Sequence, residues 1–161
     1  MRAPDDATAA GRFAAMPSWL MTQTAQQAHR LVSDGLAAVG ARGYHYRALA
    51  WLDELGPTSQ ADLGRRSGIH LSDLVATINE LADQQLVERT PDPADRRRNI
   101  ITITPAGRRQ LRRLEKQLTR VQDELLAALT PDERDQLTLL LRRVLDHHTD
   151  ARPSTPLLPN A

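Results

Sequence analysis

The sequence predicts a mainly α-helical domain that carries one small β-hairpin. Three observations support this fold class. Apolar residues recur at spacings of three and four over most of residues 18–148, which is the period of amphipathic helices. Two short β-branched runs flank a polar turn with two prolines near residue 93. Finally, 161 residues with 40% apolar side chains correspond to one ordinary folded domain.

Both ends of the chain depart from this pattern. Residues 1–17 mix Ala, Asp, Gly and Pro without periodicity, and residues 151–161 contain three prolines. Chain ends of this composition tend to fray. We therefore expect flexible tails at 1–17 and 151–161 around a single domain at residues 18–150.

The first two helices are expected at about 18–40 and 44–55. A stripe of apolar and small residues from Trp19 to Ala38 defines the first helix. The second ends at Gly56-Pro57, because this pair is a strong stop signal for a helix.

A short helix over Ala61–Arg66 and a longer helix over about 70–84 come next, joined by Gly68-Ile69. Thr58 or Ser59 can cap the short helix. One face of the longer helix is expected to be buried, because apolar residues repeat on it at spacings of four and three: Leu74, Ile78 and Leu81. Two helices joined by a short turn with Gly are typical of a helix-turn-helix.

A β-hairpin is predicted directly after these helices. Residues 86–90 alternate as a short strand, and residues 99–104 form a second, β-branched strand. A hairpin in this position is called a wing. Its turn holds three consecutive arginines, 96–98, which do nothing for the fold if they are exposed. We interpret them as a contact to an external partner; a solvated turn in an arginine-rich chain is the alternative.

Two further helices complete the domain. Thr104-Pro105 supplies an N-cap and a proline at the first helical position, and a heptad-like seam predicts a helix from there to about Leu129. Residues 130–133 form a capping box that begins the final helix. That helix has apolar residues on more than one face, which is typical of a helix that docks on another chain.

Charge is unevenly distributed along the chain. The formal net charge is only +1, and 20 of the 21 basic residues are Arg. Residues 86–113 nevertheless hold eight Arg against three acidic residues, a net charge of +5. A local excess of Arg is expected of a surface that faces phosphates, although a solvated face would have the same composition.

Several function classes are excluded by the sequence. No stretch approaches the roughly 18 apolar residues of a membrane span, and the first residues do not resemble a secretory signal. The lack of Cys excludes disulfides and a Cys nucleophile, and it fits a cytoplasmic protein. Glycine-rich phosphate loops, G-x-S-x-G elbows and H-E-x-x-H helices are missing. We therefore expect neither an enzyme nor a cofactor.

The wing region carries a family resemblance. Leu86-Val87-Glu88-Arg89 is followed by Asp92-Pro93-Ala94-Asp95-Arg96-Arg97-Arg98 and then by Ile101-Thr102-Ile103-Thr104-Pro105-Ala106-Gly107. This order resembles the "LVxR…DxxDRR…LTxxG" signature of the MarR family of bacterial transcription regulators. The resemblance extends from about Trp19 to His148.

The resemblance implies a winged helix-turn-helix at about 44–104 within an intertwined homodimer. Dimerisation helices would lie at about 18–40 and 105–148. It also implies binding to a palindromic operator, as a repressor that a small-molecule effector releases. The recognition helix 70–84 would enter the major groove, and the wing would enter the adjacent minor groove.

Individual DNA contacts follow from this assignment. By position in the motif, Asp95 would brace the wing and Arg97 would enter the minor groove, where a narrow groove concentrates negative potential. A bidentate pair with Asp95 would fix one wing arginine. Base readout looks sparse, because the expected outer face of the recognition helix (Ser72, Asp73, Ala76, Thr77 and Glu80) has no basic residue. The full set of candidate DNA-binding residues is Arg65, Arg66, His70, Ser72, Asp73, Thr77, Asp95, Arg96, Arg97 and Arg98.

An effector site is a further candidate. Members of this family often bind small aromatic acids where the DNA-binding lobe meets the dimerisation helices. Aromatic residues and two histidines gather in the first two helices, and the candidate pocket residues are Trp19, His29, Tyr44, His45 and Trp51. Simple packing of these residues in a dimer core is the alternative.

Two other functions remain open at this stage. His147 and His148 are about 100° apart on a helix, so they cannot easily chelate together, but either could meet His29 or His45 across a dimer and hold zinc in a metal-responsive regulator. No metal site is assigned on this basis. The other function is a helical protein–protein interaction module whose arginine tip binds an acidic partner.

Overall fold

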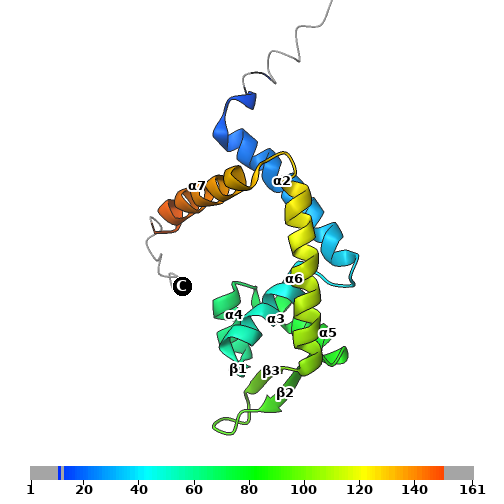
Figure 1. The fold of residues 1–161 in the computed structure, drawn as a ribbon. Coiled ribbons are helices and arrows are strands. Elements are labelled where there is room, and N and C mark those ends of the chain that lie inside the picture. Colours follow the sequence, from blue (N-terminus) through cyan, green and yellow to red (C-terminus); the bar gives the residue numbers. More distant parts are fainter. Residues whose placement is uncertain (1–10, 12, 151–161) are drawn as a thin grey trace, which may run out of the picture. The chain divides into compact units, whose positions relative to one another are not determined.

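The computed structural model describes residue 11 and residues 13–150 and confirms a mainly helical fold with a small antiparallel sheet. The chain divides into two units, Met1–Leu125 and Leu126–Ala161. The single domain expected at residues 18–150 stays a prediction, and the two units are described separately below. The elements of the first unit are α2 (Pro17–Ala37), α3 (Gly43–Leu55), β1 (Thr58–Ser59), α4 (Gln60–Ser67), α5 (Leu71–Asp83), β2 (Val87–Pro91), β3 (Asn99–Ile103) and α6 (Pro105–Leu125) (Figure 1).

The expected tails lie mostly outside the described residues. Gly11, Phe13 and Ala14 nevertheless have helical backbone, so residues 1–17 are not irregular throughout as their composition suggested. All of 151–161 lies outside the described part. None of the helices that the structure describes is long and apolar enough to cross a membrane.

The predicted hairpin is confirmed, and it belongs to a three-stranded sheet in the order β1-β3-β2. Strand β1 is only two residues long and pairs Ser59 with Ile100. Residues Thr58 and Ser59 were expected only as helix caps. Ser59 does cap α4, since its Oγ accepts the backbone N–H of Asp62 at 3.2 Å.

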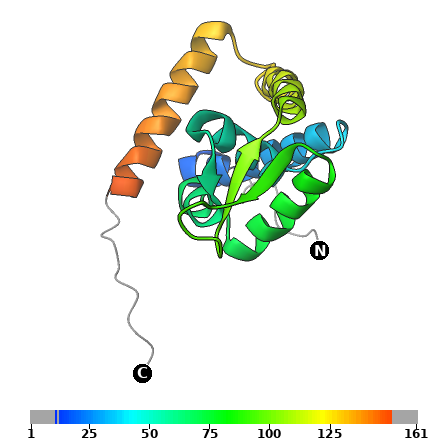
Figure 2. The same ribbon diagram turned by 90° about the horizontal axis from the view of Figure 1, so that it is seen from below.

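The core lies between α3, α4, α5, α6 and the sheet. The predicted buried face of α5 is confirmed, because Leu74, Ile78 and Leu81 are completely buried. Each such side chain contributes about 1.5–3 kcal/mol when it is removed from water. Helix α5 and strand β2 lie side by side (Figure 2). This contact sets the position of the wing relative to the second helix of the helix-turn-helix.

Helix α5 ends in a Schellman motif formed by a glutamine. The backbone N–H of Leu86 bonds to the carbonyl oxygen of Leu81 at 2.8 Å, and that of Gln85 bonds to the carbonyl oxygen of Ala82 at 2.9 Å. Gln85 has φ 57° and is the one described non-glycine residue in the left-handed region. Glycine is usual at this position, so Gln85 replaces it at the cost of some backbone strain.

Helix α6 begins as predicted and packs along α2 (Figure 1). Thr104 Oγ1 accepts the N–H of Gly107 at 3.0 Å, which confirms the N-cap. Gly107 lies so close to the carbonyl oxygen of Leu86 that a Cβ would overlap it. The helix ends at Leu125 rather than near Leu129, because a turn separates it from the next cap.

The second unit contains α7 (Pro131–Asp150). Its capping box is confirmed, since the Glu133 carboxylate accepts the N–H and O–H of Thr130 at 2.8 and 3.0 Å. These bonds, first that from the backbone, lower the pKa of Glu133. The helix exposes a group of large apolar side chains: Leu139, Leu140, Leu141, Val144 and Leu145.

Candidate nucleic-acid interface

Helix α4, a tight turn and helix α5 form the helix-turn-helix. Gly68 ends α4 with φ 65°, a left-handed conformation that glycine adopts without strain. His70 is exposed and is the N-cap residue of α5, although its side chain makes no capping bond. The two helices and the turn at Gly68-Ile69 were therefore predicted from the sequence within a few residues.

The outer face of α5 is a stripe of small and apolar residues. Ser72 and Ala76 are exposed as predicted, and Asp73 is half-buried. Leu71 and Val75 are also exposed, at 66% and 39% of their accessible surface. Methyl groups on such a face suit contact with thymine methyls, and the Ser72 hydroxyl suits base edges or phosphates.

Thr77 does not belong to this face. It is only 4% exposed, so its prediction as a DNA-contacting residue is wrong. At 100° per residue, Thr77 lies about 40° from Leu81 around the helix, at the edge of the apolar stripe. The buried face of α5 is therefore wider than the stripe of Leu74, Ile78 and Leu81 indicates.

Glu80 is directed away from the expected outer face. Its Oε2 lies 2.7 Å from Nε2 of the buried His45, and its Oε1 lies 3.1 Å from Nη2 of Arg42. The three side chains join the start of α3 to α5. Glu80 therefore orients the helix-turn-helix internally, and its negative charge is partly compensated.

The sequence interpretation missed a polar pair beside the wing. Exposed Asn79 accepts a hydrogen bond from Nη2 of Arg89 on β2. Asn79 extends the exposed stripe of α5 by one turn beyond Ala76. Its amide adds a hydrogen-bonding group of the kind that reads bases, and only the exposure of α5 could reveal it.

Hydrogen bonds that two aspartates accept from backbone N–H groups order the turn of the wing. Asp92 Oδ1 accepts the N–H of Ala94 at 2.9 Å, and Asp95 Oδ1 accepts the N–H of Arg97 at 3.0 Å. The carbonyl oxygen of Asp95 accepts the N–H of Arg98 at 2.8 Å. Asp95 thus holds the turn through main-chain bonds.

The expected bidentate pair between Asp95 and a wing arginine is not formed. Arg97 Nε lies 3.9 Å from Asp95 Oδ1, and the Arg97 side chain is 96% exposed. Arg96 is exposed as well.

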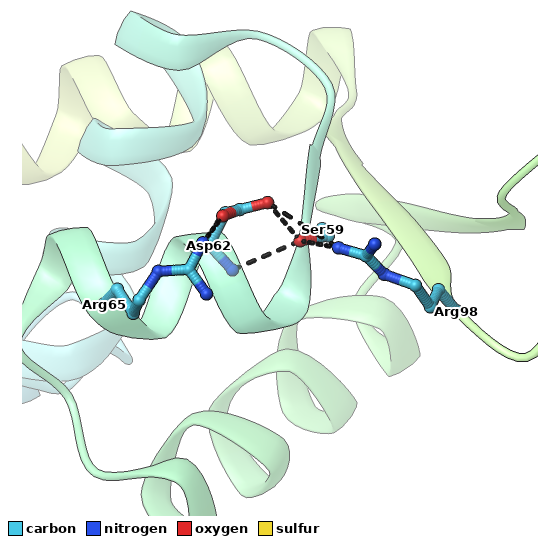
Figure 3. Close-up of polar contacts among 4 residues, drawn as sticks. All are labelled: Ser59, Asp62, Arg65 and Arg98. Atoms are coloured by element: carbon cyan, nitrogen blue, oxygen red, sulfur yellow. Dashed lines mark hydrogen bonds and ion pairs between the residues drawn. The ribbon is translucent and has the colours of Figure 1, made fainter. Parts of the chain in front are cut away.

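Arg98 has a different environment from Arg96 and Arg97 (Figure 3). Its Nη2 donates to Ser59 Oγ at 3.3 Å and lies 3.9 Å from Asp62 Oδ2. The other Asp62 oxygen pairs with Arg65. Arg66, the other arginine predicted on α4, is exposed.

The candidate effector residues do not form one pocket within this chain. Exposed Trp19 and His29 lie on α2, while Trp51 packs against the core. Tyr44 is exposed beneath the Arg47 guanidinium, 5.9 Å from its ring centroid, and His45 is buried on Glu80. Adjacent residues of a helix point about 100° apart, which separates Tyr44 from His45.

One open cavity of about 590 Å³ includes a candidate effector residue. It lies between the end of α2, the start of α3 and the end of α5. Its lining residues are Ala37, Gly40, Ala41, Arg42, His45, Glu80, Asp83 and Gln84, with no aromatic ring apart from the imidazole.

The rings of His147 and His148 meet edge to face, with centroids 5.0 Å apart. Among residues 11 and 13–150, no three His, Asp or Glu side chains lie close enough to hold a metal ion.

A helix-turn-helix whose second helix is exposed, followed by an arginine-bearing hairpin, defines a winged-helix protein. A profile of the MarR family matches residues 40–98, which include α3, α4, α5 and most of the wing. The chain is thus similar to the MarR family over the helix-turn-helix and most of the wing.

Curated relatives are named as transcription regulators. The HTH-type transcriptional repressor NicR of Pseudomonas putida is 28% identical over 103 residues, which cover 64% of this chain and 65% of that protein. The putative transcriptional regulatory protein for the hcr operon of Thauera aromatica is 34% identical over 86 residues, 53% of this chain and 52% of that protein. The chain thus spans about half to two thirds of the length of these relatives. None of these names describes an enzyme, in agreement with the sequence.

A solved structure extends the likeness beyond the family profile. The PcaV transcriptional regulator from Streptomyces coelicolor, in complex with its natural ligand, superposes with a TM-score of 0.67. It is 29% identical and covers 91% of this chain and 98% of its own.

Proposed function

We propose that this chain is a DNA-binding transcription regulator that binds a palindromic operator as a homodimer. The observation that carries the proposal is the exposed stripe of α5 next to a wing with two outward-facing arginines, Arg96 and Arg97. A helix with small outer residues fits the major groove, and a guanidinium at the tip of a hairpin fits a narrow minor groove.

The proposed DNA contacts are of two kinds: contacts to phosphates, which position the protein, and contacts to base edges, which read the sequence. Ser72, Asp73 and Asn79 on α5 face the base edges, with Asp73 able to accept from a cytosine amino group. His70 and Arg66 lie near the phosphates at the entry of α5. Thr77 is not among the contacts, because it is buried.

The protein acts as a repressor in the bacterial cytoplasm, and a small-molecule effector releases it from DNA. The names of the relatives support this proposal, since one is a repressor and another similar protein has a structure with its natural ligand. An effector pocket that uses Trp19, His29 or Tyr44 would have to form between protomers, because these residues are exposed in a single chain.

Binding to DNA from upstream of the protein's own gene tests the function directly. The wild-type chain is titrated by fluorescence anisotropy at several salt concentrations, with a shuffled duplex of the same length as the control. Phosphate contacts release counterions, so log K falls linearly with log salt, and the upstream duplex binds more tightly than the shuffled one. A flat salt dependence or equal affinity for both duplexes contradicts the proposal.

A further inference from the structure

Arg98 is connected to a network at the base of the wing. It lies next to Asn99, the first residue of β3, and reaches the Ser59 hydroxyl that caps α4. Asp62 Oδ2 accepts the proton of the same hydroxyl at 2.6 Å. The network therefore joins the wing to the first helix of the helix-turn-helix through side chains, in addition to the backbone pairing of β1 with β3 (Figure 3).

The helical side of this network is fully hydrogen-bonded at Ser59. Ser59 is buried, belongs to β1 and pairs with Ile100 on β3. Its hydroxyl has a full set of partners, since it donates to the Asp62 carboxylate and accepts from the Asp62 N–H and from Arg98. Asp62 is held between Arg98 and Arg65. Arg98 is thus anchored, whereas Arg97 extends into solvent.

We propose that Asp62 and Arg98 are positioning residues that hold the wing in the orientation in which Arg96 and Arg97 reach DNA. The proposal rests on the proposed function. Its physical basis is preorganisation: a wing that is ordered before binding loses less conformational entropy on the duplex. Arg98 then contributes through the wing rather than through a phosphate.

Electrostatics alone predicts the opposite effect for Asp62. The carboxylate lies in the lobe that faces DNA and neutralises Arg65, so its removal lowers phosphate repulsion and frees a cation. A simple charge effect therefore makes Asp62→Asn bind more tightly. Loss of the wing anchor makes it bind more weakly. The sign of the change separates the two explanations.

The test measures operator affinity for Asp62→Asn, with Glu88→Gln as the matched control. Glu88 is exposed on β2, so its substitution removes the same charge from the same lobe without touching Arg98. We expect Asp62→Asn to weaken binding about three- to tenfold, while Glu88→Gln leaves it unchanged or tighter. If Asp62→Asn behaves like Glu88→Gln, the proposal is wrong.

A double-substitution cycle isolates the pair. In an Arg98→Ala background the anchor is already lost, so Asp62→Asn no longer weakens binding and now acts only through its charge. In an Arg120→Ala background, which removes an exposed arginine of α6 outside the wing, it still weakens binding by the full factor. Equal effects in both backgrounds contradict the proposal.

A measurement without DNA distinguishes failure of this inference from failure of the proposed function. Nitrogen-15 relaxation of residues 94–98 is expected to show larger fast motion in Asp62→Asn and Arg98→Ala than in the wild type, and no change in Arg97→Ala. Unchanged relaxation in the first two variants overturns the inference. If the wild type does not bind DNA, the function fails and relaxation alone decides on the wing anchor.

Discussion

The Arg97 side chain at the tip of the wing is 96% exposed. If it occupies the minor groove, Arg97→Ala lowers operator affinity by about 1–3 kcal/mol and reduces the slope of log K against log salt by about one. Anisotropy titrations over a salt series measure both quantities. Arg120→Ala, which removes an exposed arginine of α6, is the control, and an equal loss in both variants would mean that only total charge matters.

Gln85 offers a second prediction at the residue scale. Its left-handed backbone strains a side chain with a Cβ, whereas glycine relieves the strain but makes the unfolded chain more flexible. We expect Gln85→Gly to raise the free energy of unfolding by about 0.5–1 kcal/mol, as measured by urea denaturation. Gln84 has φ −84°, so Gln84→Gly should destabilise the protein. Destabilisation by both substitutions would contradict this account.

At the scale of elements, α5, the wing and α6 meet where the backbone of α6 lies very close to the backbone that follows α5. Gly107 of α6 contacts the carbonyl oxygen of Leu86, and that oxygen also accepts the N–H of Thr104 at 3.0 Å. Helix α6 therefore begins directly against the end of the α5–β2 connection. Small residues at such a position are a packing requirement, not a consequence of helix propensity.

Substitution of this glycine tests the packing argument. Gly→Ala inside a helix usually stabilises by up to about 1 kcal/mol, but Gly107→Ala should destabilise by about 1–3 kcal/mol because a carbonyl oxygen cannot move aside. Gly43→Ala in the first turn of α3 is the control, since nothing lies within 4 Å of its added Cβ. Thermal denaturation of both variants decides, and a stabilised Gly107→Ala refutes the close contact.

Elements with a strong local signal could be predicted from the sequence. The buried face of α5, the cap at Thr104 and the box at Thr130 follow from spacing and residue type within a few positions. Strand β1 could not be predicted, because two residues have no pattern and become a strand only by pairing with β3. The same limit applies to Arg98, whose partner Ser59 is 39 residues away in sequence.

Side chains at the edges of faces were the hardest to predict. Thr77 and Glu80 both belong to α5, yet one is buried and the other turns toward His45 of α3. Periodicity locates the centre of a helix face but not its width, which depends on what packs against it. The predicted outer face of α5 is therefore wrong at these two positions, and the interface as a whole stays a prediction.

At the scale of the whole molecule, exposed apolar surface requires a partner. In the second unit, α7 exposes five large aliphatic side chains, and Leu145 is 67% exposed. In the first unit, Met16, Trp19, Leu20 and Met21 of the region around the start of α2 are exposed as well. Exposed apolar patches of this kind usually mark an interface.

We expect a second copy of the chain to cover these surfaces, and charge on α7 tests this. Leu141→Glu combined with Leu145→Glu places two carboxylates in the apolar contact, so sedimentation velocity should show a shift from dimer to monomer. Gln136→Glu adds a negative charge at an exposed polar position of α7 and should leave the dimer intact.

Since a monomer binds one half-site without the avidity of a linked pair, operator affinity should fall by at least about a hundredfold in the double variant. A double variant that stays dimeric would place the interface elsewhere, whereas a monomer with undiminished affinity would mean that the chain does not bind a palindrome as a dimer.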